Sequence, residues 1–137
     1  MAFNGNWKLV ANEGLAAFSK AIGVADEQIA ANKDFGNPDA NVVEALSVDG
    51  STVSVKVTIG GAAFRESSLP IGAEAAGKGV DGRDAKHTVT VNGNTITRVQ
   101  KGDGYECTYN RTVDGNNMTL EMVGPGGVKA TRKYVRA

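Results

Sequence analysis

Short glycine-containing turns between alternating segments constrain the fold of this chain more than any other feature of its sequence. Five pairs separate these segments: Asp49-Gly50, Asp81-Gly82, Asn92-Gly93, Asp103-Gly104 and Asp114-Gly115. Such pairs are favoured in two-residue hairpins of type I′, which need positive φ at both turn residues. The pattern predicts a meander of antiparallel strands from about residue 41 onward. It also explains part of the high glycine content, 18 of 137 residues.

Alternation within these segments assigns the residues of each strand to two faces. Side chains along a strand point to opposite faces in turn, so Val53, Val55 and Val57 lie on one face. About ten strands in so short a chain are expected to close into a barrel, because closure removes the unpaired edges of the sheet. Pro70 cannot donate a hydrogen bond to a neighbouring strand, so its segment is expected to be a gap or a weakly paired edge.

One segment near the N-terminus has the periodicity of a helix. Leu15, Phe18 and Ile22 recur at helical spacing, and Gly23 is placed to end the helix. A second short helix is predicted from Asp26 to Ala31. The predicted order is one strand, two short helices and about nine further strands, within a single domain over residues 1–137.

Charge and cysteine content argue against several classes of function. Lys and Arg together number 15, and so do Asp and Glu, which gives a net charge of zero. This balance lacks the basic excess of a nucleic-acid groove or a polybasic membrane anchor. The single cysteine, Cys107, leaves no internal disulfide and is typical of a reducing compartment. The N-terminal residues do not resemble a signal peptide. We therefore expect a cytoplasmic protein without nucleic-acid partners.

The last predicted strand places an arginine and a tyrosine on one face. Arg132 and Tyr134 are two residues apart, and two lysines mark the opposite face as the solvent face. Arg111 likewise shares a face of its own strand with Cys107 and Tyr109. Guanidinium groups inside a barrel are costly unless an anion satisfies them, and a carboxylate matches the arginine fork. Either these residues form an interior carboxylate site, or the arginines lie at the barrel ends and pair with glutamate or solvent.

Four motifs along the chain carry a family resemblance. They are Phe3-Asn4-Gly5-Asn6-Trp7-Lys8, Ile71-Gly72-Ala73-Glu74, Val80-Asp81-Gly82-Arg83 and Thr131-Arg132-Lys133-Tyr134-Val135-Arg136. In this order, with two helices after the first strand, they resemble the intracellular lipid-binding proteins, the fatty-acid-binding and cellular retinoic-acid-binding carriers. The resemblance implies an all-β fold, a ten-stranded antiparallel up-and-down β-barrel (a calycin-like β-clam), capped by a helix-turn-helix over an internal ligand cavity.

The resemblance also implies a function. It implies a carrier, not an enzyme, that binds a long-chain fatty acid or a similar apolar carboxylate without any cofactor. Arg111, Arg132 and Tyr134 would hold the ligand carboxylate. A retinoid or bilin carrier of the same fold is the alternative, ahead of an extracellular lipocalin-type carrier and an enzyme acting on a bound lipid. The candidate ligand-binding residues are Phe18, Arg83, His87, Arg98, Tyr109, Arg111, Met118, Leu120, Met122, Arg132 and Tyr134.

The orientation of Arg98 is left open by its strand. In one register Ile96, Arg98 and Gln100 face inward, and in the other the intervening residues do, which leaves Arg98 in solvent. If Arg98 faces inward, the ligand or its bound water is expected to be more anionic than a simple fatty acid.

The lone histidine, His87, is expected to face inward with Val89. There it is either a ligand contact or a hydrogen-bonded core residue. One histidine and one cysteine are too few to complete a zinc site, so we expect no metal.

The second predicted helix has few features of a membrane-docking element. Its residues 27–31 include no lysine or arginine, so we expect weak or no contact with anionic membranes. Its small side chains are expected to leave a wide portal rimmed by Leu15, Phe18 and Phe64. The expected partner is a small hydrophobic ligand, bound by a monomer.

Overall fold

The computed structural model describes residues 3–78 and 83–137, and the elements below belong to these residues. The strands are β1 (Gly5–Glu13), β2 (Val42–Val48), β3 (Thr52–Ile59), β4 (Ala62–Pro70), β5 (Ala75–Lys78), β6 (Asp84–Asn92), β7 (Thr95–Gly102), β8 (Tyr105–Asp114), β9 (Asn117–Val123) and β10 (Lys129–Arg136). The helices are α1 (Leu15–Ala21) and α2 (Asp26–Ala31), with 3₁₀ helices η1 (Lys33–Gly36), η2 (Pro38–Ala40) and η3 (Pro125–Gly127). This order confirms the predicted strand, helical pair and nine further strands.

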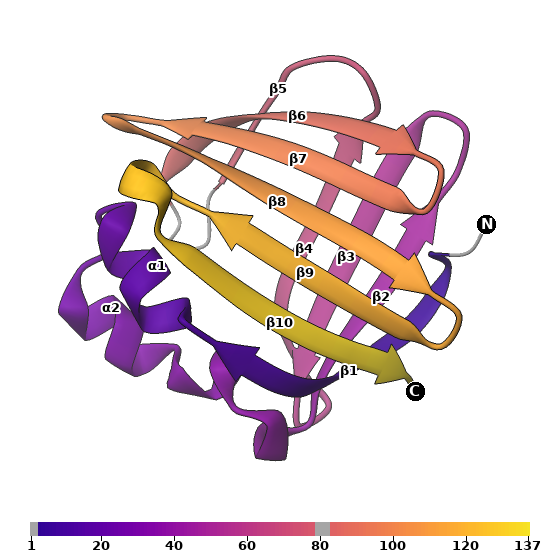
Figure 1. The fold of residues 1–137 in the computed structure, drawn as a ribbon, viewed down its shortest axis with the longest axis horizontal. Helices are drawn as coiled ribbons and strands as arrows, with labels where there is room; N and C mark the ends of the chain where they lie inside the picture. The colour runs from indigo at the N-terminus through magenta and orange to yellow at the C-terminus, as the bar shows by residue number, and fades with distance from the viewer. Residues whose placement is uncertain (1–2, 79–82) are drawn as a thin grey trace.

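The ten strands form one sheet that is nearly closed into a barrel. Their spatial order is β4-β3-β2-β1-β10-β9-β8-β7-β6-β5, with antiparallel neighbours throughout, so β1 and β10 join the two ends of the chain. In Figure 1, β6 to β9 lie in front of β2 to β4, and the sheet folds over on itself. The all-β barrel with a helical pair is confirmed.

The barrel opens between β4 and β5, which have no ladder of hydrogen bonds between them. Pro70 ends the edge strand β4, as expected for a residue that cannot donate a ladder hydrogen bond. Just beyond it, Ile71 forms an isolated bridge with Val89 on β6, and Gly72 donates its backbone N–H to the Val89 carbonyl at 2.8 Å. The gap is therefore closed at one end and open along β5.

The side chains that face the barrel interior form one continuous core. Trp7 and Leu9 of β1 are fully buried, and the Trp7 Nε1–H donates to the Phe3 carbonyl oxygen at 2.9 Å. Burial alternates along β2 and β9, where Val42, Leu46 and the other inward residues are buried. The predicted alternation of strand faces is therefore present, and it carries charged residues inward together with apolar ones.

The two helices cover one end of the barrel (Figure 1). Gly14 precedes α1 with φ of +78°, and a Cβ at this position would lie 2.5 Å from the Lys129 carbonyl oxygen. Only glycine allows this close crossing of β10. Gly23, with φ of +87°, follows α1 as predicted. Among the described residues, no helix has the length and apolar content needed to cross a membrane.

The hairpins are present at four of the predicted turns, but the predicted type I′ geometry is wrong. Gly93, Gly104 and Gly115 have positive φ, whereas among the described residues Asn41 is the one non-glycine residue with positive φ. Type I′ needs positive φ at two successive residues. The Asp49 turn instead uses the aspartate side chain, which accepts hydrogen bonds from the backbone N–H groups of Ser51 and Thr52 at 2.7 Å each. The Asp81-Gly82 pair lies outside the described residues.

Candidate ligand-binding site

Arg132 and Tyr134 lie on the inner face of β10, as their spacing predicts. Arg132 has no exposed surface and Tyr134 is 1% exposed. The Arg132 Nε–H donates to the Tyr134 hydroxyl oxygen at 2.7 Å, which holds the two side chains in one orientation. The Arg132 guanidinium also lies 3.9 Å from the centre of the Phe35 ring. The barrel-end alternative therefore does not apply to Arg132, which is in the core.

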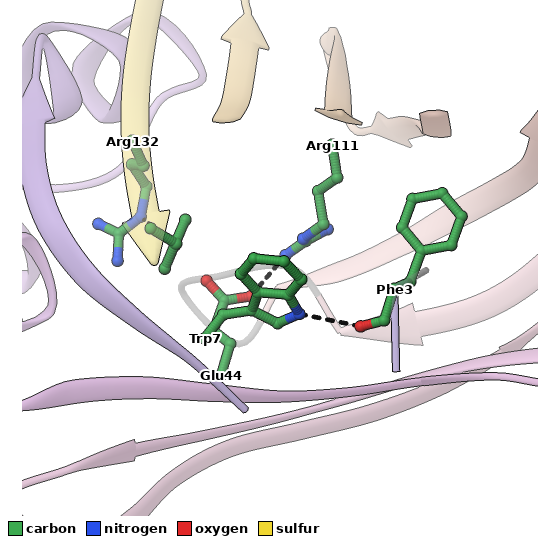
Figure 2. A network of polar contacts seen from close by, with 6 residues as sticks. Phe3, Trp7, Glu44, Arg111 and Arg132 are labelled. Atoms are coloured by element: carbon green, nitrogen blue, oxygen red, sulfur yellow. Dashed lines mark hydrogen bonds and ion pairs between the residues drawn. The ribbon is translucent and has the colours of Figure 1, made fainter. Parts of the chain in front are cut away.

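Arg111 is paired with a glutamate that was not among the predicted site residues. Its Nη2 lies 2.9 Å from Oε1 of Glu44 on β2, whose side chain is 1% exposed. Figure 2 shows this ion pair beside Trp7, with Arg132 on the other side of Glu44 in that view. The glutamate pairing that we considered for the arginines is thus present at Arg111, but it lies inside the barrel and not at its end.

The charges around Glu44 determine its protonation. Burial alone would raise the pKa of Glu44, but the guanidinium groups of Arg111 and Arg132 and a hydrogen bond from Tyr134 hold this pKa below its ordinary value. Burial raises the pKa of Tyr134, and the Glu44 charge raises it further. Burial would lower the pKa of Arg111, but its interactions with the Glu44 carboxylate and with the neighbouring tyrosines together raise this pKa. At neutral pH the cluster therefore holds two guanidinium cations, one carboxylate and a neutral phenol.

The structure resolves the two registers left open for Arg98. Ile96 and Gln100 are buried, so Arg98 faces the same interior. Its guanidinium lies 4.1 Å from the centre of the Tyr109 ring on β8, and its Nε has no hydrogen-bond partner among the described residues. Burial lowers the pKa of Arg98, and the nearby charge of Arg111 lowers it further. Arg98 is therefore an interior cation stacked on an aromatic ring.

Two cavities meet at the side chains of Phe35 and Arg65. One, of about 230 Å³, lies under the helices and includes Phe18 and Met122 in its lining. The other, of about 50 Å³, lies in the barrel and is lined by Arg98, Arg111, Glu44 and several valines. Phe35 and Arg65 line both cavities. The Phe35 ring stacks on Phe64 with centroids 5.3 Å apart, and the Arg65 guanidinium lies 5.0 and 5.1 Å from the two ring centres.

Phe35 and Arg65 were absent from the predicted site. Phe35 lies in the 3₁₀ segment η1, which has no strand or α-helical period that would indicate its direction. Arg65 lies on β4, where burial hardly alternates and the pairing with β3 shifts register. Phe64, predicted at the portal rim, does pack in this cluster. The local sequence signals for Phe35 and Arg65 were therefore weak.

The remaining predicted residues, apart from Arg83, lie in three places. Phe18 is fully buried and packs edge-to-face on Tyr109 with centroids 5.8 Å apart, at the boundary of helices and barrel. Met118 and Leu120 are buried in the core and are not among the lining residues of the two cavities. His87 is buried and lines, with Arg98, a third cavity of about 230 Å³ at the β4–β5 gap.

Arg83 has a structural position away from these cavities. Its Nη2 donates to the Ile22 carbonyl oxygen at 2.7 Å, at the end of α1, and its guanidinium lies 4.9 Å from the centre of the Tyr105 ring. The arginine therefore ties the first helix to the barrel wall.

Comparisons with known proteins support the family resemblance. The adipocyte fatty acid-binding protein of Pygoscelis papua is 29% identical over 137 residues, covering 98% of this chain and 97% of that protein. Among solved structures, the REP1-NXSQ fatty acid transporter is 26% identical with a TM-score of 0.82, covering 98% of this chain and 95% of that chain. The wild-type fluorescent protein UnaG is 27% identical, also with a TM-score of 0.82, and the match covers 98% of this chain and 97% of that chain. No protein-family profile matches the chain.

Over nearly its whole length the chain is thus similar to fatty acid-binding proteins, which supports its resemblance to the intracellular lipid-binding protein family. Within the described part of the chain, no group of three or more His, Cys, Asp or Glu side chains is arranged to hold a metal ion. Cys107 is a buried free thiol, and burial raises its pKa, so it is mainly the neutral thiol at neutral pH. Burial, and then the Arg98 charge, lower the pKa of His87.

Acid is expected to remove the stabilisation that the Glu44 charge gives the folded protein. The folded-state pKa of Glu44 lies below its ordinary value of 4.5. Its contribution to stability is therefore present above the pKa of the unfolded chain and is lost as pH falls through the folded-state pKa. We expect the difference in free energy of unfolding between wild type and Glu44→Gln to shrink from about pH 6 to about pH 3 in urea titrations.

A matched variant controls for general acid effects. Glu27 is an exposed residue of α2, and Glu27→Gln should stay close to wild type at each pH. A difference between wild type and Glu44→Gln that stays constant over the same pH range would contradict the stabilising role of the Glu44 charge.

Proposed function

We propose that the protein binds one long-chain fatty acid, or a similar apolar carboxylate, inside the barrel and carries it without chemical change. The relatives named above include a fatty acid-binding protein and a fatty acid transporter, which supports a lipid as the ligand. The observation that carries the proposal is the fully buried Arg132, whose Nη1 and Nη2 have no hydrogen-bond partner among the described residues. A buried guanidinium group costs free energy unless an anion lies beside it.

The charges beside Arg132 are consistent with one ligand carboxylate. Arg111 and Arg132 provide two positive charges and Glu44 one negative charge, so this part of the barrel retains one positive charge. A carboxylate would neutralise it and accept hydrogen bonds from the free Arg132 nitrogens. The head group of the ligand is therefore proposed to bind at Arg111, Arg132 and Tyr134.

The hydrocarbon chain is proposed to extend toward the helices. Val57 and Val89 line the inner cavity, and the larger cavity under α1 and α2 is mostly apolar. Burial of each methylene contributes about 0.8 kcal/mol, so a long acyl chain supplies the main driving force. Because Phe35 and Arg65 line both cavities, we expect these two side chains to move when a chain occupies both.

The other expectations for this protein are proposals of the same kind. We propose a carrier rather than an enzyme, acting in the cytoplasm as a monomer with weak or no membrane contact. The absence of lysine and arginine from α2 supports the last point, since basic side chains attract anionic lipids.

A pigment is the second candidate ligand. The likeness to the fluorescent protein UnaG, at 27% identity over nearly the whole chain, is the observation that favours it. A bilin-type pigment with carboxylates would use the same interior arginines. Its absorption band would distinguish it at once from a fatty acid or other colourless lipid.

The ligand class is tested by extraction of the natively purified protein. The extract is analysed by mass spectrometry and by its absorption spectrum. We expect a fatty acid at near one molecule per protein. A phospholipid, or a coloured compound at that stoichiometry, would redirect the assignment of the ligand.

The head-group position is tested by Arg132→Met on delipidated protein. Hydrogen bonds to charged groups contribute about 1.5–3 kcal/mol, so we expect at least a tenfold weaker affinity for tetradecanoate, measured by calorimetry. Lys133→Met, on the exposed face of the same strand, is the control and should bind like wild type. Circular dichroism checks that both variants are folded. Equal affinity of wild type and folded Arg132→Met would rule out the proposed head-group site.

A further inference from the structure

Among the described residues, guanidinium groups outnumber carboxylates around the inner cavity. Arg65, Arg98 and Arg111 line the inner cavity together with a single carboxylate, that of Glu44. The fully buried Arg132 lies beside Glu44 and adds a fourth guanidinium group. One ligand carboxylate would neutralise the charge left at Arg111 and Arg132. The positive charge of Arg98 would then still lack a negative partner among the described residues that line this cavity.

The strand register places Arg98 next to the proposed head-group position, on the side of the helices. Arg98 pairs with Tyr109 across β7 and β8, and Ile96 pairs with Arg111, so the two arginines lie two residues apart along the barrel wall. Two residues of strand span about 7 Å. Tyr109 in turn packs on Phe18 of α1. A ligand that extends from Arg111 toward the helices therefore passes Arg98 directly after its head group.

The two remaining cavity arginines differ in what their side chains already contact. The Arg65 guanidinium lies over the Phe35 and Phe64 rings at the boundary of the cavities. Arg98 stacks on the single ring of Tyr109, and its buried Nε has no hydrogen-bond partner among the described residues. The Nε of Arg111 and both Nη atoms of Arg132 also lack a hydrogen-bond partner among the described residues. Together these nitrogens carry more N–H groups than the two oxygens of one carboxylate can accept with good geometry.

We propose that the ligand is a single-chain amphiphile whose head group carries two negative charges, one bound at Arg111 and Arg132 and the second at Arg98. This inference rests on the proposed function and narrows its ligand class. A phosphate monoester places both charges on one group with three acceptor oxygens, and a dicarboxylate places them on two neighbouring groups. Either head group would use the Arg98 donor, which a simple fatty acid leaves without a partner.

The test compares three ligands with the same tridecyl chain on delipidated protein. Tetradecanoate carries one negative charge, whereas tridecyl phosphate and tridecylsuccinate carry two when fully ionised. Affinities are measured by calorimetry at about pH 8, above the second phosphate pKa of about 6. We expect at least one dianion to bind about tenfold or more tightly than tetradecanoate, since a charged hydrogen bond is worth at least that factor.

Arg98→Met and Arg98→Gln identify the residue responsible. Each is expected to remove the preference, so that the dianion binds no more tightly than tetradecanoate to the same variant. Arg98→Gln replaces Arg98→Met in the comparison if Arg98→Met fails to fold. Lys101→Met, an exposed position on the same strand, is the matched control and should keep the preference.

The possible outcomes separate this inference from the proposed function. Preference for the phosphate alone or for the succinate alone supports the inference and identifies the arrangement of the two charges. Tight binding of tetradecanoate without any preference for a dianion overturns the inference and leaves the proposed function intact. A preference that survives in folded Arg98 variants also overturns it. If none of the three ligands binds, the proposed function itself is wrong.

Discussion

Arg111→Met is expected to lower the free energy of unfolding by about 3 kcal/mol, because it leaves the Glu44 carboxylate buried without its ion-pair partner. The pair is close, at 2.9 Å, and the two side chains are 11% and 1% exposed. Removal of one partner of a buried pair typically costs about 3–5 kcal/mol. We expect the lower end of this range because Arg132 still lies near Glu44. Urea unfolding followed by Trp7 fluorescence measures the change.

A double variant tests the stated cause of this loss. Arg111→Met combined with Glu44→Gln removes the charge as well as its partner, and a neutral glutamine beside methionine is far less costly to bury than an unpaired carboxylate. We expect the double variant to recover most of the stability lost in Arg111→Met, so that the two changes are strongly non-additive. A double variant as unstable as Arg111→Met would show that lost packing, and not the unpaired carboxylate, causes the effect.

Trp7→Ala is expected to lower the free energy of unfolding by about 3–5 kcal/mol. Trp7 is fully buried on β1, the strand that joins β2 to β10 and so closes the barrel between the two ends of the chain. Its ring packs under the Arg136 guanidinium, 4.3 Å from the ring centre, and its Nε1–H donates to the Phe3 carbonyl oxygen. Alanine removes both contacts and leaves a cavity at the seam.

The measurement must not depend on tryptophan fluorescence, because Trp7 is the one tryptophan of the chain. Far-ultraviolet circular dichroism in urea reports unfolding of wild type and variant alike. Trp7→Phe is the control: it keeps an aromatic ring and loses the indole hydrogen bond, at an expected cost of about 1 kcal/mol beyond its smaller volume. If Trp7→Ala is no less stable than Trp7→Phe, packing of the indole is not what stabilises the seam.

Local patterns predicted much of the barrel and part of the site. Alternation identified the inner faces of β8 and β10, so Arg111, Arg132 and Tyr134 were expected inside, as found. The same pattern was ambiguous for Arg98, because on β7 the residues at even and odd positions are similarly polar. Pairing of Arg98 with Tyr109 and of Gln100 with Cys107 resolves that ambiguity, since their partners on β8 have one clear inner face.

The local pattern around Glu44 indicated that this residue is buried, but not which residue it pairs with. It shares one face of β2 with Val42, Leu46 and Val48, so a carboxylate on an otherwise apolar face was a readable sign of burial. Its partner Arg111 is 67 residues away along the chain. Nothing in either segment alone indicates that the two side chains meet.

The sequence by itself determined the order of strands and helices, the positions of the turns and the inward direction of most site residues. These properties depend on neighbours two to four residues apart, and such periods can be read along a chain. The partner of Arg111, the direction of Arg98 and the positions of Phe35 and Arg65 were decided by the tertiary structure. Each depends on which strands become neighbours when the barrel closes, and interior charges interact across that closed space rather than along the chain.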